Sequence, residues 1–202
     1  IDATIEVIKN VINKSGVDPE AIAGVSCTGH GNGLYLMGEE LTPVRNGIIS
    51  TDNRAIAYIN KWYEEKGFEE KIMPLTMSSV WAGQPVALLA WLKDNEPEII
   101  DKTKYIFMVK DLVRYYLTET ATLEITDISG TNLINLTTKN YDDEILGFFD
   151  ILEWKEKLPP LVNSTEEAGK ISKKMAELTG LVEGTPVAGG VFDIASSAVA
   201  TG

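Results

Sequence analysis

The sequence lacks several features that common protein classes require. Its 202 residues include one cysteine, Cys27, which excludes an internal disulfide and fits a reducing, cytoplasmic setting. A membrane-spanning helix needs about 18 consecutive apolar residues, and because no such run occurs we expect no membrane partner. Histidine also occurs once, at His30. Since a catalytic metal site needs three protein ligands, we expect no metal site there.

The charge balance is strongly acidic. Thirty Asp and Glu residues against 18 Lys and Arg residues give a net charge of −12. Nucleic-acid binding needs clustered basic residues, and none are seen, so we expect no nucleic-acid partner. The sequence also contains no Gly-x-x-x-x-Gly-Lys-Ser/Thr phosphate loop.

The length is that of one sizeable domain, and the 44% hydrophobic and 24% charged content is ordinary for a globular protein. The first residues, Ile1-Asp-Ala-Thr4, include neither an initiator methionine nor the basic region of a signal peptide. We therefore expect a chain cut from a longer one.

The last stretch, 185–202, combines a short apolar run, the pair Gly189-Gly190 and a lone carboxylate, Asp193, which opens a run of small residues. This pattern predicts a strand, a tight turn and a helix. Asp193 then lies at the carboxyl end of a strand, where ligands collect in open α/β sheets. The alternative is that Asp193 only caps the helix.

A glycine-rich loop, Thr28-Gly-His-Gly-Asn-Gly33, follows a predicted buried strand over 22–27 and precedes a second strand over 34–37. A dinucleotide-binding loop would be followed by a helix, so the glycines indicate a tight strand-to-strand connection instead. This connection would bring His30 and Asn32 close to a small ligand. A plain turn with both side chains in water is the alternative.

Other segments carry regular patterns. Apolar residues at helical spacing predict amphipathic helices over 3–14, 55–66 and 172–178. An apolar run over 105–109 predicts a strand covered on both faces, followed by a helix with Asp111 as its cap and Arg114 in a structural role. Asp52 and Arg54 can face one cleft or form an ordinary ion pair at a helix start.

Several motifs together resemble those of the FGGY carbohydrate kinases, over essentially the whole chain. Besides the loop over 28–33, they are Ser50-Thr-Asp-Asn-Arg54, the set Gly83, Pro85, Trp91, Leu92, Asp94 and Asn95, Lys110-Asp-x-x-Arg114, and Thr126-Asp-Ile-Ser-Gly-Thr131. Leu88 stands where a signature lysine is usual, which favours the L-xylulose kinases within the family. The sequence departs from the family where His30 replaces a glutamine and Asn32 replaces the histidine that touches the sugar.

The resemblance implies an α/β fold of the ribonuclease H-like, actin/hexokinase type, with a mixed sheet flanked by helices and incomplete at both ends. Residues 1–202 would form part of the N-terminal, sugar-binding domain of a two-domain kinase. The phosphate-binding hairpin and the adenosine-binding domain would lie outside them. We expect no kinase activity from these residues alone.

The resemblance also implies roles for individual residues. Asp193 would be the catalytic base, and the sugar site would include His30, Asn32, Asp52, Arg54 and Trp81, with the indole of Trp81 either stacked on the sugar or packed in the protein. ATP and Mg²⁺ would be bound mostly by parts outside this chain. The partner would be a small-molecule sugar, and a homodimer is compatible with the family.

The expected reaction of the intact enzyme is phosphorylation of L-xylulose to L-xylulose 5-phosphate by ATP. A kinase for another ketose or polyol, of the xylulose, ribulose or glycerol type, is one alternative. A non-catalytic binding module with an actin-like core is the other.

Overall fold

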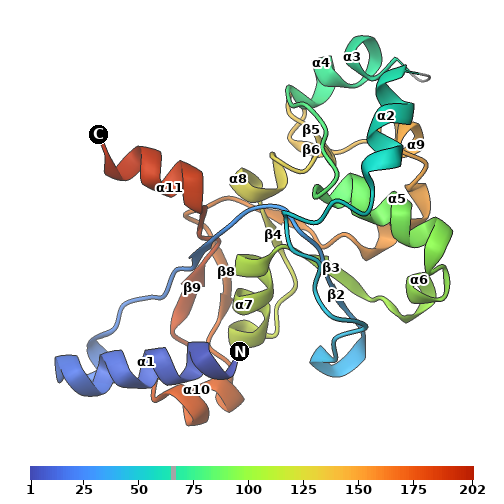
Figure 1. The fold of residues 1–202 in the computed structure, drawn as a ribbon. Helices are drawn as coiled ribbons and strands as arrows, with labels where there is room; N and C mark the ends of the chain where they lie inside the picture. Colours follow the sequence, from blue (N-terminus) through green and yellow to red (C-terminus); the bar gives the residue numbers. More distant parts are fainter. Residues whose placement is uncertain (65–66) are drawn as a thin grey trace.

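The computed structural model describes residues 1–64 and 67–202 as a mixed α/β structure (Figure 1). Its strands are short. They are β1 (Thr28–Gly29), β2 (Tyr35–Met37), β3 (Tyr105–Phe107), β4 (Leu123–Glu124), β5 (Ile134–Asn135), β6 (Asn140–Tyr141), β7 (Leu161–Val162), β8 (Glu167–Lys170), β9 (Pro186–Ala188) and β10 (Val191–Phe192).

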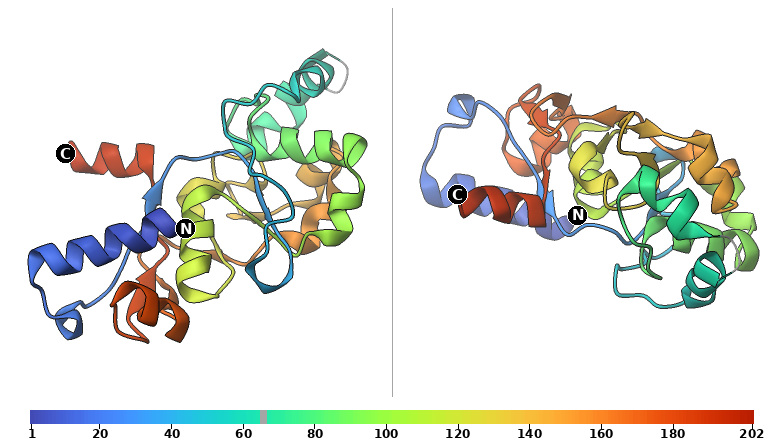
Figure 2. Two further views of the ribbon diagram at one scale, coloured as in Figure 1. Left: turned by 60° about the horizontal axis from the view of Figure 1, so that its bottom comes forward. Right: turned by 90° about the horizontal axis from the view of Figure 1, so that it is seen from above.

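Helices surround these strands. The α-helices are α1 (Asp2–Ser15), α2 (Ile56–Glu64), α3 (Phe68–Lys71), α4 (Met73–Thr76), α5 (Pro85–Asn95), α6 (Glu98–Lys102), α7 (Val109–Thr118), α8 (Ile125–Ile128), α9 (Asp143–Phe148), α10 (Lys173–Thr179) and α11 (Asp193–Ala200). In the described part of the chain, 3₁₀ helices cover Pro19–Ala21, Glu39–Leu41 and Leu152–Lys157. Helices α2, α5 and α9 gather at one end of the molecule, α1 and α10 lie side by side at the other, and α11 projects outward (Figures 1 and 2).

The pairing of the strands is mixed, as predicted. Strand β1 runs parallel to β10, and a bridge from Val25 to Val187 extends this pairing to β9. Strand β9 is also antiparallel to β8, so the segment 25–29, the segment 187–192 and β8 form one sheet. Strands β4 and β7 are parallel, whereas β2 and β3 are antiparallel.

The predicted buried strand over 22–27 was wrong in its position and its burial. Regular pairing begins at Thr28, preceded by the single bridge at Val25, and no side chain over 22–27 is fully buried. The segment pairs along 187–192 on one side, and its other side borders an open groove between α1 and α7. An apolar run does not by itself show how much of a strand is covered.

The larger of two hydrophobic cores includes the buried faces of α2, α5 and α9. Trp62 is buried edge-on against Phe149, with 4.6 Å between the ring centroids, and Phe68 lies against the same group. A second, smaller core forms beneath α1 and α10 around Ile171 and Met175. The end of β1 and the glycine-rich loop that follows it lie between these two cores.

The helix predictions were largely confirmed. Helix α1 ends as expected at Gly16, which has the left-handed φ of 66° that glycine tolerates, and α10 ends in the same way at Gly180. Two apolar positions that were expected to face a core do not, because Val11 is 60% exposed and Ile56 is 53% exposed. Of the helix predicted over 55–66, the structure has Ile56–Glu64, and 65–66 lie outside the described residues.

Over residues 1–64 and 67–202, we find no helix with the length and apolar character needed to cross a bilayer.

Candidate functional site

Asp193 and the glycine-rich loop meet where β1 and β10 end. The two strands are parallel, with Gly29 opposite Phe192, so the residues that follow each strand emerge at the same edge of the sheet. His30 follows Gly29 and Asp193 follows Phe192. The ring of Phe192 also lies directly against Gly31, where a β-carbon would overlap it. The prediction that Asp193 stands at a strand end and opens a helix was therefore confirmed.

The carboxylate of Asp193 makes a local contact. Asp193 is the first residue of α11, and the N-cap position belongs to Phe192, which has no capping side chain. Oδ1 of Asp193 accepts a hydrogen bond from the backbone N–H of Ile194, 2.8 Å away. The side chain is only half-buried, so it remains accessible to a ligand.

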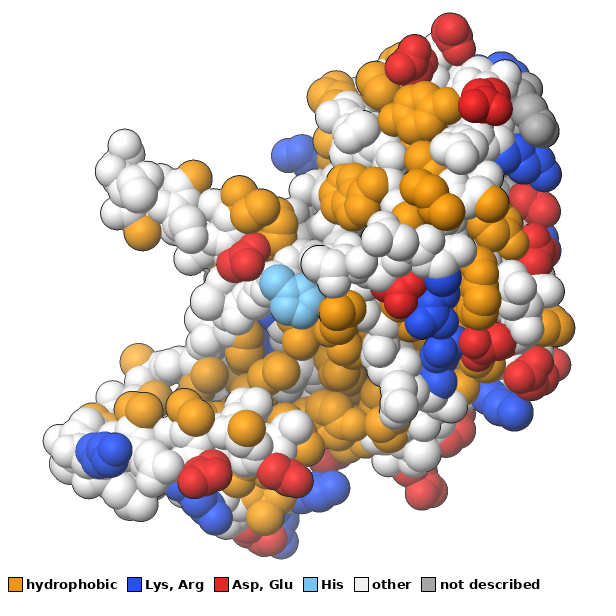
Figure 3. Space-filling model, viewed as in Figure 1, with side chains coloured by type: hydrophobic (Ala, Val, Ile, Leu, Met, Phe, Trp, Pro, Cys, Tyr) orange, Lys and Arg blue, Asp and Glu red, His pale blue; other side chains and the backbone are white. Residues whose placement is uncertain are grey.

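His30 and Asn32 differ in environment. His30 is exposed, with Nε2 3.4 Å from the hydroxyl of Tyr35, and Figure 3 shows this histidine at the edge of the hollow between α11 and α1. Asn32 is buried and has a left-handed φ of 60°. Within the described residues its Oδ1 has no hydrogen-bond partner. A buried amide oxygen without a partner is costly, so Asn32 is prepared to accept a hydrogen bond from a ligand or a water molecule.

Three loops that are distant in the sequence touch through their backbones. The N–H of Gly33 donates to the carbonyl of Gly83 at 3.2 Å, and a β-carbon at Gly33 would lie 2.7 Å from the carbonyl oxygen of Ile48. A β-carbon at Gly83 would overlap the carbonyl of Ser50. The structure thereby brings together the loops that carry Asn32, Asp52 and Trp81.

Asp52 and Arg54 form an ion pair with each other. Nε of Arg54 lies 2.9 Å from Oδ1 of Asp52, and Nη2 lies 3.0 Å from Oδ2, so the contact is bidentate. Hydrogen bonds from Arg54 lower the pKa of Asp52. The guanidinium of Arg54 also lies over the ring of Trp91, at 4.9 Å from its centroid. The sequence left open whether Asp52 and Arg54 face one cleft or form an ion pair at a helix start. The structure shows the ion pair, just before α2.

Trp81 stands in the loop before α5 and is 41% exposed. Its backbone N–H donates to Oε1 of Gln84 at 3.1 Å. The same oxygen accepts a hydrogen bond from Nδ2 of Asn132 at 2.9 Å, and Nε2 of Gln84 donates to the carbonyl of Gly130 at 2.8 Å. Gln84 therefore ties the Trp81 loop to the segment 126–132.

Gln84 and Asn132 are not among the site residues that the sequence predicted. Both are fully buried, and Oδ1 of Asn132 is a second buried oxygen without a partner in the described part of the chain. A polar residue just before the proline that starts a helix was a weak signal for Gln84. Nothing in the sequence pattern indicated that its partner would be Asn132.

A buried charge cluster lies behind the strand ends. Nζ of Lys110 is 2.9 Å from Asp111, 3.2 Å from Glu124 and 3.5 Å from Asp127, and Arg114 contacts Asp111 at 2.6 Å. All five side chains are fully buried. Such a cluster is stable only when its charges are paired.

The prediction that Asp111 caps helix α7 was wrong. Met108 holds the N-cap position, and Asp111 is turned inward because Lys110 and Arg114 need a buried counter-charge. The structural role expected for Arg114 agrees with its burial. Burial raises the pKa of Asp127 to about 7, with the neighbouring carboxylates of Asp111 and Glu124 adding to the effect against the lowering influence of Lys110.

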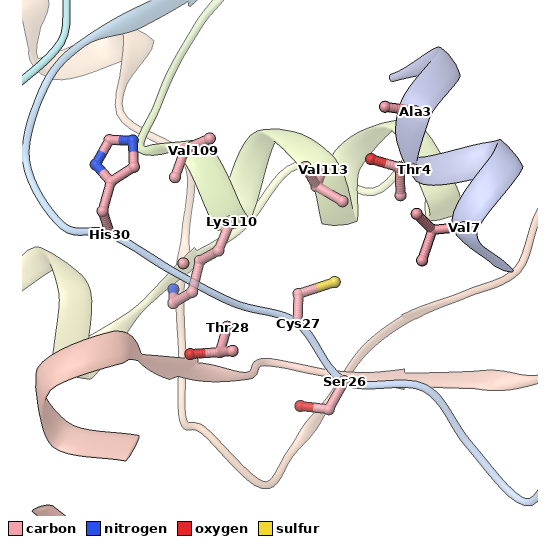
Figure 4. Close-up of a pocket in the computed structure, with 11 residues that line it drawn as sticks. Ala3, Thr4, Val7, Ser26, Cys27, Thr28, His30, Val109, Lys110 and Val113 are labelled. Carbon is pink, nitrogen blue, oxygen red and sulfur yellow. The ribbon is translucent and has the colours of Figure 1, made fainter. Parts of the chain in front are cut away.

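A groove of about 550 Å³ runs between α1, the segment 26–30 and α7 (Figure 4). Its lining is mostly apolar, with Cys27 pointing toward Val7 and His30 at the opposite end. Burial raises the pKa of the Cys27 thiol. The groove touches the predicted site only through His30, so it is a separate feature.

The structure thus places the six predicted residues on adjoining strand ends and loops. Apart from the Asp52–Arg54 pair, no hydrogen bond or ion pair joins them to one another within residues 1–64 and 67–202. In the same residues, no three His, Cys, Asp or Glu side chains form a group that could hold a metal ion. The arrangement suits a polar small molecule bound between loops, with a carboxylate at one side.

Comparison with known proteins connects this arrangement to a family. The family model described as the FGGY family of carbohydrate kinases, N-terminal domain, matches residues 1–200. The L-xylulose/3-keto-L-gulonate kinase of Escherichia coli K12 is 40% identical over 196 residues, which are 97% of this chain and 39% of that protein. A probable L-xylulose kinase of Pasteurella multocida is 39% identical over 199 residues, covering 97% of this chain and 40% of that protein.

The fold is similar to that of solved sugar kinases. A ligand-bound xylulose kinase from Lactobacillus acidophilus superposes with a TM-score of 0.84 at 26% identity, over 95% of this chain and 38% of that one. The expected actin/hexokinase-like α/β fold was therefore confirmed. The chain spans about 40% of the length of the relatives it matches.

Proposed function

Because the chain belongs to the FGGY family of carbohydrate kinases, we propose that residues 1–202 form most of the sugar-binding N-terminal domain of an enzyme that phosphorylates a keto-sugar with ATP. The first candidate substrate is L-xylulose, giving L-xylulose 5-phosphate. The support for this choice is the similarity to relatives named as L-xylulose kinases.

The single observation that carries the proposal is the position of Asp193. Its carboxylate stands at the carboxyl end of β10, beside the loop that carries His30 and Asn32, and no buried counter-charge is bound to it within the described residues. A sugar hydroxyl is a poor nucleophile whose proton becomes acidic as its oxygen attacks phosphorus. A carboxylate within hydrogen-bond distance can orient that oxygen and accept the proton.

The other residues would hold the sugar. The unpartnered Oδ1 of Asn32 can accept a hydrogen bond from a sugar hydroxyl, and the exposed indole of Trp81 offers a flat apolar surface to a sugar ring or chain. Asp52 and Arg54 already bind each other. In this proposal they offer the sugar only the carboxylate lone pairs and guanidinium N–H groups that this ion pair leaves free.

ATP is the second substrate in this proposal, and Mg²⁺ accompanies its phosphates in phosphoryl transfer. Within the described residues, no three His, Cys, Asp or Glu side chains form a group suited to a metal ion, so we assign Mg²⁺ to no residue of this chain.

Two measurements on the full-length enzyme test the proposal. The first is ADP release with ATP and a panel that contains L-xylulose, D-xylulose, ribulose, 3-keto-L-gulonate and glycerol. L-xylulose should give the highest kcat/KM. A higher value for another sugar would replace the substrate, and binding of neither sugar nor MgATP would favour a non-catalytic module.

The second measurement is kcat of Asp193→Asn. Asparagine keeps the size of the side chain and removes the proton acceptor, so we expect kcat to fall by roughly 10²–10⁴-fold with little change in sugar affinity. The control is Asp143→Asn, because Asp143 is likewise the first residue of a helix, α9, which lies on the opposite side of the molecule from α11 (Figure 1), and its ion pair with Lys155 is at the surface. If the folded Asp193→Asn enzyme has the same kcat as this control, Asp193 is not the proton acceptor.

A further inference from the structure

The residue before Asp193 is held by a hydroxyl from another element. The backbone N–H of Phe192 donates to Oγ1 of Thr126, 3.0 Å away, and Thr126 lies in the short helix α8. Oγ1 of Thr126 is also 2.7 Å from Oε2 of Glu124. Because a carboxylate only accepts, the Thr126 hydroxyl donates to Glu124 and uses its own lone pair for Phe192.

Glu124 is a firm anchor for that hydroxyl. It is fully buried, and its carboxylate also accepts from the backbone N–H of Thr126 at 2.9 Å, from Oγ of Ser164 at 2.6 Å and from Nζ of Lys110 at 3.2 Å. Burial opposes its ionisation, yet the hydrogen bonds from Ser164 and Thr126 and the charge of Lys110 together lower the pKa of Glu124. The carboxylate is therefore charged at neutral pH, and the direction of the Thr126 hydroxyl is set by it.

A second contact holds the other end of the same strand. Nη1 of Arg114 donates to the carbonyl of Gly189, in the turn between β9 and β10, and Nη2 donates to the carbonyl of Thr122 at 2.6 Å. Arg114 is itself paired with Asp111. Strand β10 is thus tied at its beginning and at its end to the charged cluster around α7 and α8.

Helix α11 offers no comparable support to Asp193. It contains no buried residue, and its apolar side chains Ile194 and Val199 are exposed. In Figure 1 the helix projects from the body of the molecule. Within the described residues, the placement of Asp193 therefore depends on the strand that precedes it.

We propose that Thr126 is a positioning residue for Asp193, acting through the hydrogen-bonded series Glu124–Thr126–Phe192. This inference rests on the proposed function of Asp193 as proton acceptor. The hydroxyl keeps the last peptide group of β10 in one orientation, and that peptide group sets the direction of the next side chain. A shift of about 1 Å in a reacting group can cost roughly 100-fold in rate, so even a small rotation would be measurable.

Thr126→Val in the full-length kinase removes the hydroxyl at nearly constant volume. We expect kcat to fall by roughly 10- to 100-fold with the KM values for sugar and MgATP within about twofold, because the change affects orientation and not binding. Thr126→Ser keeps the hydroxyl and should restore kcat to within about threefold of the natural enzyme. Thr126→Ala, which is smaller, provides the same comparison if the valine side chain prevents folding.

Thr179→Val is the matched control. The Thr179 hydroxyl likewise donates one hydrogen bond and accepts one. It donates to the backbone carbonyl of Met175 at 2.6 Å, where Thr126 donates to a carboxylate, and it accepts from the backbone N–H of Leu181 at 3.2 Å, but it lies in α10. Its loss should leave kcat unchanged. An equal fall in kcat for Thr126→Val and Thr179→Val would mean a general structural effect and would overturn the inference.

The double variant Thr126→Val, Asp193→Asn separates this inference from the proposed function. If Thr126 acts through Asp193, adding Thr126→Val to Asp193→Asn should lower kcat by less than about twofold further. A full further loss, a raised sugar KM with unchanged kcat, or an unaltered Thr126→Val enzyme would each refute the positioning role. If Asp193→Asn alone keeps its kcat, the proposed function itself has failed, and the positioning role that rests on it fails with it.

Discussion

The aromatic ring of Phe192 lies against the backbone of Gly31, so that the residue before Asp193 and the residue after His30 are in direct contact. The ring fits there because glycine has no side chain, and a β-carbon at position 31 would overlap it. This contact joins the end of β10 to the glycine-rich loop and keeps the two halves of the proposed site at a set separation.

Gly31→Ala should therefore disturb the site from within. The new methyl group must displace the Phe192 ring, and over-packing of this kind costs about 1–3 kcal/mol of stability. We expect a lower melting temperature and a reduced kcat in the full-length enzyme, measured by thermal unfolding and ADP release.

The matched control is Gly147→Ala. Gly147 lies inside α9, and a β-carbon there would meet no atom within 4 Å. Alanine is favoured over glycine within a helix by roughly 0.5–1 kcal/mol, so this variant should be more stable. A Gly31→Ala enzyme as stable as Gly147→Ala would show that the Phe192 ring moves without cost.

Trp81→Ala should weaken sugar binding more than it weakens the fold. The indole is 41% exposed, so its removal leaves no closed cavity, whereas loss of an apolar surface over the sugar should cost about 1–3 kcal/mol of binding. The measurements are KM for the sugar, KM for MgATP and the melting temperature. We expect only the first to change clearly.

Trp154→Ala serves as the comparison, because Trp154 is fully buried. This variant should lower the melting temperature strongly. If Trp81→Ala lowers the melting temperature in the same way and leaves the sugar KM unchanged, Trp81 is a packing residue and contributes nothing to the sugar site.

Asp127 should make stability depend on pH. Burial raises its pKa to about 7, so between its ordinary pKa of 3.8 and about pH 7 the folded protein holds a proton that the unfolded chain releases. The free energy of unfolding should consequently fall as pH rises through this window, by at most about 1.4 kcal/mol per pH unit from this group. Above pH 7 its contribution should be constant.

Asp127→Asn removes this titration. The free energy of unfolding is measured by urea denaturation from pH 5 to pH 8 for both proteins. As pH rises, the variant should become more stable relative to the natural protein. Asp142→Asn is the control, because a hydrogen bond from Asn135 lowers the pKa of Asp142 below its ordinary value of 3.8, so that its effect on stability should not change between pH 5 and pH 8. A difference for Asp127→Asn that is independent of pH would contradict the raised pKa.

Local patterns were enough to predict several elements. The end of α1 at Gly16, the helix over 173–179 and the strand that leads to Asp193 depend on the spacing of apolar residues and on glycines with left-handed φ angles, and these are properties of neighbouring residues. The family followed from motifs whose order along the chain is likewise visible in the sequence. For this reason the location of Asp193 at a strand end was predicted correctly.

Only the tertiary structure decided which of these residues meet. An aspartate before a helical pattern is usually a cap, but Asp111 is buried because Lys110 and Arg114 come from the same helix into a space without water. Gln84 pairs with Asn132, and Thr126 holds Phe192, across 48 and 66 positions of the chain. Such contacts depend on how the loops approach one another in space, and hydrogen bonding between distant residues leaves no periodic trace in a single sequence.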